Sequence, residues 1–134
     1  MANVTPHLDL IGINVADMAR SLAFYRELGL DIPADADAAP HAELSLPGGL
    51  RLAWDTLDTI RSFDPDYAVP SGNSSIALAF LHESPADVDA TYRALVGAGA
   101  EGHLAPWDAF WGQRYAVVVD PDGNHVDLFA ALPA

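Results

Sequence analysis

The amino-acid sequence predicts a single α+β domain built from two similar halves, each a strand, a helix and further strands. The segment FYRELGLDI at 24–32 returns in altered form as TYRALVGAGAE at 91–101, half the chain length later. A strand-like apolar run precedes each copy, and a turn followed by a strand comes after it. A repeat of this kind indicates a duplicated structural unit.

The first half opens with a strand at 8–15. Its sequence, LDLIGINV, alternates in the way that a half-buried strand does. The residues expected to pack under a helix are Ile11, Ile13 and Val15. Those expected on the opposite face are Leu10, Gly12 and Asn14. A glycine and an asparagine suit a cavity wall better than a packed core.

The first helix is expected to follow between Asp17 and Gly29. Asp17 is a suitable N-cap, and Gly29 is a suitable stop because glycine adopts the left-handed conformation at little cost. Its buried stripe is predicted to be Met18, Leu22, Tyr25 and Leu28. The run LPGGLRLAW at 46–54 then predicts a turn and a strand that closes this half with Trp54.

The second half repeats the order from residue 74. A strand-like run at 74–80 leads to a helix with Ser84 as N-cap, Pro85 in the first turn, Asp87 in a capping-box-like position and Gly97 as its stop. The buried stripe of this helix is predicted to be Val88, Tyr92 and Leu95.

The closing strand comes after the turn DPDGN. The residues expected on its helix side are Val126, Leu128 and Ala130, and those expected opposite are Asp127 and Phe129. The internal repeat predicts that Trp54 lies on the same face as Phe129. The domain boundaries are 1–134 for the single domain, with the first module at about 5–56, a linker or lid at about 57–73 and the second module at about 74–132.

Composition narrows the class of protein. The 134 residues are 51% hydrophobic and include no cysteine, so disulfides, thiolate metal sites and a catalytic thiol are excluded. The start of the chain lacks the pattern of a secretory signal, and no stretch is long enough to span a membrane. We therefore expect a cytoplasmic protein.

Charge narrows the class of partner. Six Arg and Lys residues against nineteen Asp and Glu residues give a formal net charge of −13. Such a surface repels phosphate backbones and anionic lipids, so we expect no nucleic-acid partner and no membrane partner. A neutral or cationic small molecule is electrostatically easier to bind. The alternative explanation is that the acidic charge only keeps the protein soluble.

The segment APWDAFWGQRY at 105–115 concentrates aromatic side chains. Trp107, Phe110, Trp111 and Tyr115 fall within nine positions, although the chain has only three tryptophans. The segment is acidic and contains a proline and a glycine, which is typical of a loop. Tyr115 also starts the strand-like run YAVVV, whose alternate residues are expected to belong to the core.

These motifs resemble the vicinal oxygen chelate superfamily of glyoxalases, extradiol dioxygenases and bleomycin-resistance proteins. The resemblance covers nearly the whole chain and depends mainly on FYRELGL at 24–30 and on DPDGNHVDLF at 120–129. It implies two tandem βαβββ modules that form curled half-sheets around a cavity. It also implies a homodimer, with modules exchanged between chains.

The enzymes of this superfamily hold a metal ion at set positions. The resemblance places these positions at Leu10, at Ser75 or one of its neighbours, and at Asp127, so two of the three ligands are missing here. His125 lies two residues from Asp127 on the same strand face, but a third donor is lacking nearby. A metal site needs three or four converging donors, so we expect no metal and no other cofactor.

A narrower resemblance points to mitomycin-binding-type antibiotic resistance proteins. It is carried by the stretches 41–56, 61–65 and 101–116. It implies metal-free binding and sequestration of a planar aromatic antibiotic, either mitomycin-like or a quinoline or quinoxaline intercalator, and so self-resistance without catalysis. The ligand-binding residues it implies are His41, Trp54, Trp107, Phe110 and Trp111.

His41 and Trp111 are expected to hold the ligand between an imidazole and an indole, with the His41 ring also donating a hydrogen bond to it. Trp54 remains open between the pocket and the core. Two other functions also remain open: a metal-dependent lyase or dioxygenase of the same superfamily, and a protein interaction module whose pocket takes no small molecule.

Overall fold

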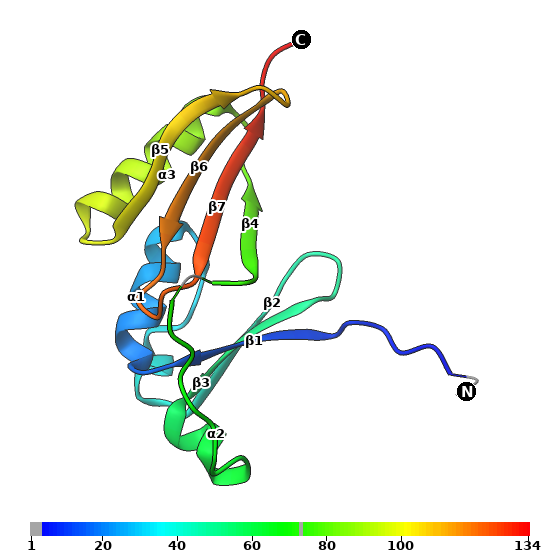
Figure 1. Ribbon diagram of the computed structural model, residues 1–134, viewed down its shortest axis with the longest axis vertical. Helices are drawn as coiled ribbons and strands as arrows, with labels where there is room; N and C mark the ends of the chain where they lie inside the picture. The colour runs from blue at the N-terminus through cyan, green and yellow to red at the C-terminus, as the bar shows by residue number, and fades with distance from the viewer. Residues whose placement is uncertain (1–3, 73) are drawn as a thin grey trace. The chain divides into compact units, whose positions relative to one another are not determined.

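The strands of the protein form two separate sheets, one of three strands and one of four (Figure 1). The computed structural model describes residues 4–72 and 74–134. The chain divides into two compact units. The first unit consists of the residues up to Ala19 together with Asp31–Ala68, and the second consists of Arg20–Leu30 and Val69–Ala134.

The three-stranded sheet belongs to the first unit. Its strands β1 (Leu10–Val15), β2 (His41–Ser45) and β3 (Arg51–Thr56) lie in the order β1-β3-β2. β3 pairs in parallel with β1 and antiparallel with β2. A short 3-10 helix, η1 (Ala34–Ala38), comes before β2.

The four-stranded sheet belongs to the second unit. The strands β4 (Ala77–Leu81), β5 (Glu101–Ala109), β6 (Gln113–Val119) and β7 (His125–Ala131) lie in the order β4-β7-β6-β5. The helix α3 (Pro85–Gly97) packs against β5, β6 and β7, and Figure 1 shows it running alongside β5. The helix α1 (Met18–Leu28) joins this unit from Arg20 onward.

The predicted α+β class and the two strand-helix-strand modules are confirmed. The second module has the order strand, helix and three strands in full, and its first strand pairs in parallel with its last. The first module matches it strand for strand except at one position: the 3-10 helix η1 stands where the second module has β5.

The predicted core faces are also confirmed. Ile13 and Val15 are buried in β1, whereas Ile11, predicted on the same face, is half-buried. Val126, Leu128 and Ala130 are buried in β7. The predicted stripe of α1 is buried throughout: Met18, Leu22, Tyr25 and Leu28. In α3, Val88 and Leu95 are buried and Tyr92 is half-buried.

Two of the predicted helix ends form as the sequence predicts. The Ser84 hydroxyl accepts a hydrogen bond of 3.2 Å from the backbone N–H of Asp87, at the start of α3. At the end of α1, Gly29 has a φ of 122°, a left-handed conformation that residues with a side chain rarely adopt. The predicted stop at Gly97 is wrong, because Gly97 is the last helical residue of α3 and the left-handed conformation is that of Gly99, with a φ of 107°.

Two sequence-based expectations need correction. The linker at 57–73 begins with a helix, α2 (Leu57–Phe63), whose N-cap is Thr56. The aromatic segment at 105–115 is no loop, because most of it belongs to β5 and β6 and only a tight turn joins them. Strand pairing across the sheet overrides the local proline and glycine signals here.

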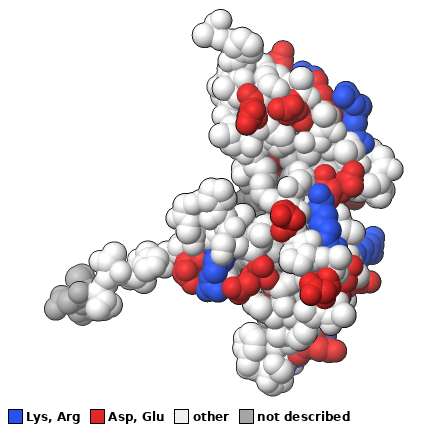
Figure 2. All heavy atoms as spheres, turned by 180° about the vertical axis from the view of Figure 1, so that it is seen from behind, with Lys and Arg blue, Asp and Glu red and all other residues white. Residues whose placement is uncertain are grey.

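The surface carries the acidic excess of the sequence. On the face shown in Figure 2, Asp and Glu side chains are scattered widely and Arg side chains are few. No helix in residues 4–72 or 74–134 is both long and apolar enough to cross a bilayer.

Candidate functional site

The candidate site lies on the face of the four-stranded sheet that points away from α3, which we call the open face. Side chains alternate along β7, so the buried Val126, Leu128 and Ala130 lie on the α3 side. Asp127 and Phe129 therefore point to the open face, where both are half-buried. The sequence predicts this division.

Strand register brings three aromatic rings to one level of the open face. Trp107 of β5 is paired with Tyr115 of β6, and Tyr115 is paired with Phe129 of β7. Paired residues of neighbouring strands project from the same face of a sheet. Three rings from three strands thus form a row across the sheet.

Trp111 joins this row from the β5–β6 turn. Tyr115 is at the centre, with ring centroids 5.7 Å from Trp107, 5.3 Å from Trp111 and 6.1 Å from Phe129. The two tryptophan contacts are edge-on, whereas the rings of Tyr115 and Phe129 are stacked. With Phe110, whose ring is 5.0 Å from that of Trp111, these residues form what we call the aromatic cluster.

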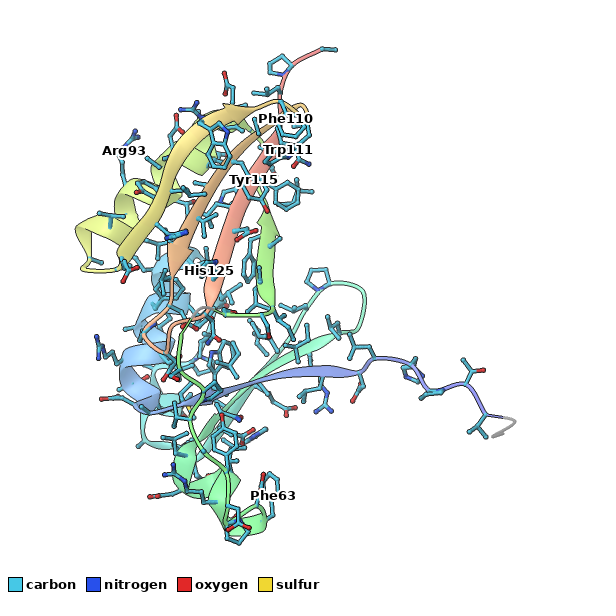
Figure 3. All side chains as sticks on the ribbon, in the orientation of Figure 1. Phe63, Arg93, Phe110, Trp111, Tyr115 and His125 are labelled. Carbon is cyan, nitrogen blue, oxygen red and sulfur yellow. The ribbon has the colours of Figure 1, made fainter. Side chains whose placement is uncertain are left out.

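The outer end of the aromatic cluster is open to solvent. Phe110 is 96% exposed and Trp111 is 47% exposed. Figure 3 shows both residues at the hairpin end between β5 and β6. The indole N–H of Trp111 donates a hydrogen bond of 2.8 Å to the side-chain oxygen of Gln113, which restrains the ring. Exposed aromatic surface of this kind, held in place, is typical of a binding surface.

The backbone fixes the turn that carries these two rings. Gly112 has a φ of 90°, and its N–H donates to the carbonyl of Ala109 over 3.1 Å. Its carbonyl accepts a hydrogen bond of 3.0 Å from the N–H of Leu132, near the end of the chain. The aromatic cluster is therefore presented by a braced hairpin instead of a mobile loop.

A carboxylate lies beside the aromatic cluster. The Tyr115 hydroxyl donates a hydrogen bond to Oδ2 of Asp127. Burial, and then this hydrogen bond to the carboxylate, raise the pKa of Tyr115 to about 12. Tyr115 therefore remains a hydrogen-bond donor at neutral pH and does not act as a base.

The metal positions of the superfamily enzymes are not filled by suitable donors. Leu10 opens β1, Ser75 lies just before β4, and Asp127 is bound to the Tyr115 hydroxyl. Among the residues that the structure describes, no group of three or more His, Asp or Glu side chains could hold a metal ion. The side chains at these positions do not fit a catalytic metal.

His41 lies in the first unit, on the exposed strand β2. Its Nδ1 is 2.6 Å from Oδ1 of Asp55, and its Nε2 is 2.9 Å from Oε2 of Glu43. The hydrogen bond with Glu43, and then that with Asp55, raise the pKa of His41. Both ring nitrogens already have carboxylate partners, and the expected hydrogen bond from this ring to a ligand stays a prediction.

Trp54 is completely buried, and its predicted face is wrong. It pairs with Ile13 of β1, so its side chain projects from the face of the three-stranded sheet that carries the core residues Ile13 and Leu52. His41, by contrast, pairs with Asp55 and projects from the other face of this sheet. The three-stranded sheet therefore separates Trp54 from His41.

Of the predicted ligand-binding residues, Trp107, Phe110 and Trp111 come together in the second unit. His41 lies in the first unit, so its pairing with Trp111 stays a prediction. Sequence reasoning undervalued Tyr115 and missed Phe129 as site residues. The alternation along 113–119 and 125–131 was the signal that could have identified both.

Comparisons with known proteins agree with this fold. The model of the glyoxalase/bleomycin resistance protein/dioxygenase superfamily matches residues 7–128. An uncharacterized protein of Mycobacterium bovis is 30% identical over 131 residues, which cover 93% of this chain and 80% of that protein.

Two solved structures share the fold. A glyoxalase/bleomycin resistance protein/dioxygenase family enzyme from Burkholderia phytofirmans is similar with a TM-score of 0.80 and 20% identity, over 95% of this chain and all of the other. A glyoxalase-related enzyme from Fulvimarina pelagi is similar with a TM-score of 0.78 and 23% identity, over 94% of this chain and 88% of the other. The strand order, the duplicated modules and the family match together place the chain in the glyoxalase/bleomycin resistance/dioxygenase superfamily, the vicinal oxygen chelate proteins.

Proposed function

We propose that this protein binds a planar aromatic antibiotic without a metal ion and sequesters it, giving self-resistance. The ligand is mitomycin-like or an intercalator with quinoline or quinoxaline rings, as the narrower resemblance implies. The proposal includes no chemical change of the ligand. It also includes a cytoplasmic homodimer, which the same resemblance implies.

The observation that carries the proposal is the aromatic cluster on the open face. Stacking on a well-placed aromatic side chain contributes about 1–3 kcal/mol per ring. Two or three such contacts, together with burial of the ligand, are enough for binding at about micromolar concentration. The exposure of Phe110 and Trp111 leaves ring surface available for a flat ligand.

The side chains at the metal positions support binding over catalysis. Leu10 and Ser75 replace two of the three ligands of the superfamily enzymes, and Asp127 is hydrogen-bonded by Tyr115. Enzymes of the superfamily use a metal to polarise substrate oxygens, and residues 4–72 and 74–134 of this chain offer no comparable set of donors.

His41 enters the proposal through the resemblance and not through its geometry. Both ring nitrogens of His41 are directed at the carboxylates of Asp55 and Glu43, so the ring offers a ligand its flat face. In this proposal it contributes stacking only.

Tryptophan fluorescence titrated with mitomycin C and with a quinoxaline antibiotic tests the proposal. Each titration is run with a chelator and again with added Zn²⁺ or Fe²⁺, and the ligand is recovered afterwards for mass analysis. We expect saturable quenching that neither the chelator nor the metal changes, and a ligand of unaltered mass.

Each of the other two functions predicts a different result. A metal-dependent lyase or dioxygenase gains affinity when the metal is added, or returns a ligand of altered mass. A protein interaction module gives no saturable quenching with any of these small molecules. Either result would contradict the proposal.

A further inference from the structure

Asp127 offers a hydrogen-bond acceptor beside Tyr115 of the aromatic cluster. Its Oδ2 accepts from the Tyr115 hydroxyl. For its Oδ1, no donor is found among residues 4–72 and 74–134. The side chain is half-buried, and it lies on the same face of β7 as Phe129, two residues away. One carboxylate oxygen is thus left for a ligand.

No arginine of the described strands neutralises this carboxylate from the open face. Arg114, the arginine of β6, points to the α3 side, where it pairs with Asp89 over 3.0 Å. Arg51, the arginine of β3, forms ion pairs with Asp9 and Glu43. The chain contains six Lys and Arg residues in all, against nineteen Asp and Glu.

The other titratable groups on the open face lie at its far end, where β5 and β7 begin. They are Glu101, His103 and His125. The rings of the two histidines contact each other, with centroids 4.8 Å apart. Figure 3 shows His125 well away from Phe110 and Trp111, toward the start of β7.

The surroundings of Asp127 favour a nitrogen donor. Its neighbours across the sheet are Val117 of β6 and Ala79 of β4, which offer no polar side chain. A half-buried carboxylate beside apolar groups forms its strongest hydrogen bonds with charged N–H donors. The Asp127 carboxylate contacts the Tyr115 hydroxyl, and the ring of Tyr115 stacks on that of Phe129, so the carboxylate lies beside these two rings.

We propose that Asp127 accepts a hydrogen bond from an N–H or ammonium group at the edge of a planar aromatic ligand, and so selects ligands that carry a ring-edge cation over neutral ligands of the same shape. Tyr115 holds the carboxylate in place for this contact. The inference depends on the proposed function, because the ligand must stack on the aromatic cluster.

Two acridines of nearly equal shape separate the inference from the proposed function. 9-Aminoacridine is a cation at neutral pH, whereas acridine is neutral. Calorimetric titration of the full chain with each compound should give about tenfold tighter binding of 9-aminoacridine, since a hydrogen bond to a charged group is worth that much. Acridine-9-carboxylate, an anion of the same ring, should bind weakest.

Three variants test whether the preference for the cation depends on Asp127. Asp127→Asn keeps the shape of the side chain and an acceptor for Tyr115, and should bring 9-aminoacridine to the affinity of acridine. Glu101→Gln removes one negative charge from the same face at a distance, and should leave the preference unchanged. Circular dichroism confirms that each variant is folded. Tyr115→Phe keeps the ring and frees the second oxygen of Asp127, so it should still prefer the cation.

The outcomes are distinguishable. Equal binding of acridine and 9-aminoacridine by the unaltered protein would overturn the inference and leave aromatic binding intact. A preference lost equally in Asp127→Asn and Glu101→Gln would also overturn it, because the attraction would then be one of overall charge. Binding of neither compound would overturn both the inference and the proposed function.

Discussion

Tyr25 in α1 donates a hydrogen bond of 2.6 Å to Oδ2 of Asp120, which lies 95 residues later in the turn between β6 and β7. Both residues belong to the second unit and both are buried. Asp120 also accepts from the backbone N–H groups of Asp122 and Asn124, over 2.9 and 2.8 Å. The two sequence motifs that carry the family resemblance, at 24–30 and 120–129, are therefore joined by this hydrogen bond.

Removing this hydroxyl should destabilise the fold. Tyr25→Phe leaves the buried Asp120 carboxylate with one donor fewer, at a cost of about 1–3 kcal/mol in the free energy of unfolding. Urea denaturation measures this loss in the free energy of unfolding. Tyr92→Phe is the matched control, because Tyr92 is the counterpart of Tyr25 in the repeat and is only half-buried. An equal loss in both variants would refute the special role of the Tyr25–Asp120 contact.

Gly102 in β5 lies against Tyr92 of α3. A Cβ at this position would stand 2.2 Å from the Tyr92 hydroxyl oxygen and 2.9 Å from its Cζ. Gly102→Ala should therefore lower the free energy of unfolding by about 1–3 kcal/mol, as overpacking does.

Gly97, at the end of α3, provides the control for Gly102. A Cβ there would meet no heavy atom of the described residues within 4 Å. Gly97→Ala should raise stability by up to about 1 kcal/mol, because alanine loses less backbone entropy in a helix. Thermal unfolding of the two variants should therefore shift in opposite directions, and a fall in both would contradict the packing described here.

His41 should make stability depend on pH. Its partners Glu43 and Asp55 raise its pKa above the ordinary value of 6.5. The stability that protonated His41 adds to the fold is therefore fully present below about pH 6.5, and it is lost as the pH rises through the raised pKa. It should be at most about 1 kcal/mol, because the side chain is 44% exposed and solvent screens the pairs.

The comparison of His41→Gln with the unaltered protein measures this effect. The difference in the free energy of unfolding should be largest at acidic pH and should shrink toward alkaline pH. A difference that grows as the pH rises would show that the ring is not held as an imidazolium between these carboxylates.

Trp111 should matter more for ligand binding than for stability. Trp111→Ala removes a half-exposed ring from the aromatic cluster and should weaken binding of a planar antibiotic about tenfold or more. Its free energy of unfolding should change little, because the residue lies in an exposed turn. Phe110→Ala should weaken binding less, since Phe110 contacts Trp111 but no other ring of the described cluster. Fluorescence or calorimetric titration of both variants would contradict this ranking if Phe110→Ala had the larger effect.

The sequence is most informative where the signal is local. The N-cap at Ser84, the stop at Gly29 and the alternation along 126–130 all depend on a few neighbouring residues, and all are confirmed. The α2 helix was missed because aspartate, serine and proline around it suggested a linker. Its cap, Thr56, was a usable local signal.

Features that depend on pairing between strands distant in the sequence were harder to predict than these local ones. The face of Trp54 was wrong because the two modules were aligned on their last aromatic residue. The turn glycines Gly49 and Gly123, which both have positive φ, give the correct alignment. They match Trp54 with Leu128, a core residue, and Asp55 with Phe129.

The meeting of Trp107, Tyr115 and Phe129 is likewise a product of register. Each belongs to a different strand, and only the pairing of β5, β6 and β7 brings their rings to one level. The sequence indicated that aromatic residues were concentrated near the site, but not which of them share a face. A shift of one residue in any strand would have moved its ring to the α3 side.

The indole N–H signals in a ¹H–¹⁵N correlation spectrum test the central claim most directly, because the chain has only three tryptophans. Titration with a planar antibiotic should shift the signals of Trp107 and Trp111 in a saturable way and leave that of the buried Trp54 in place. A shift confined to Trp54, or no shift at saturating ligand, would contradict binding at the aromatic cluster.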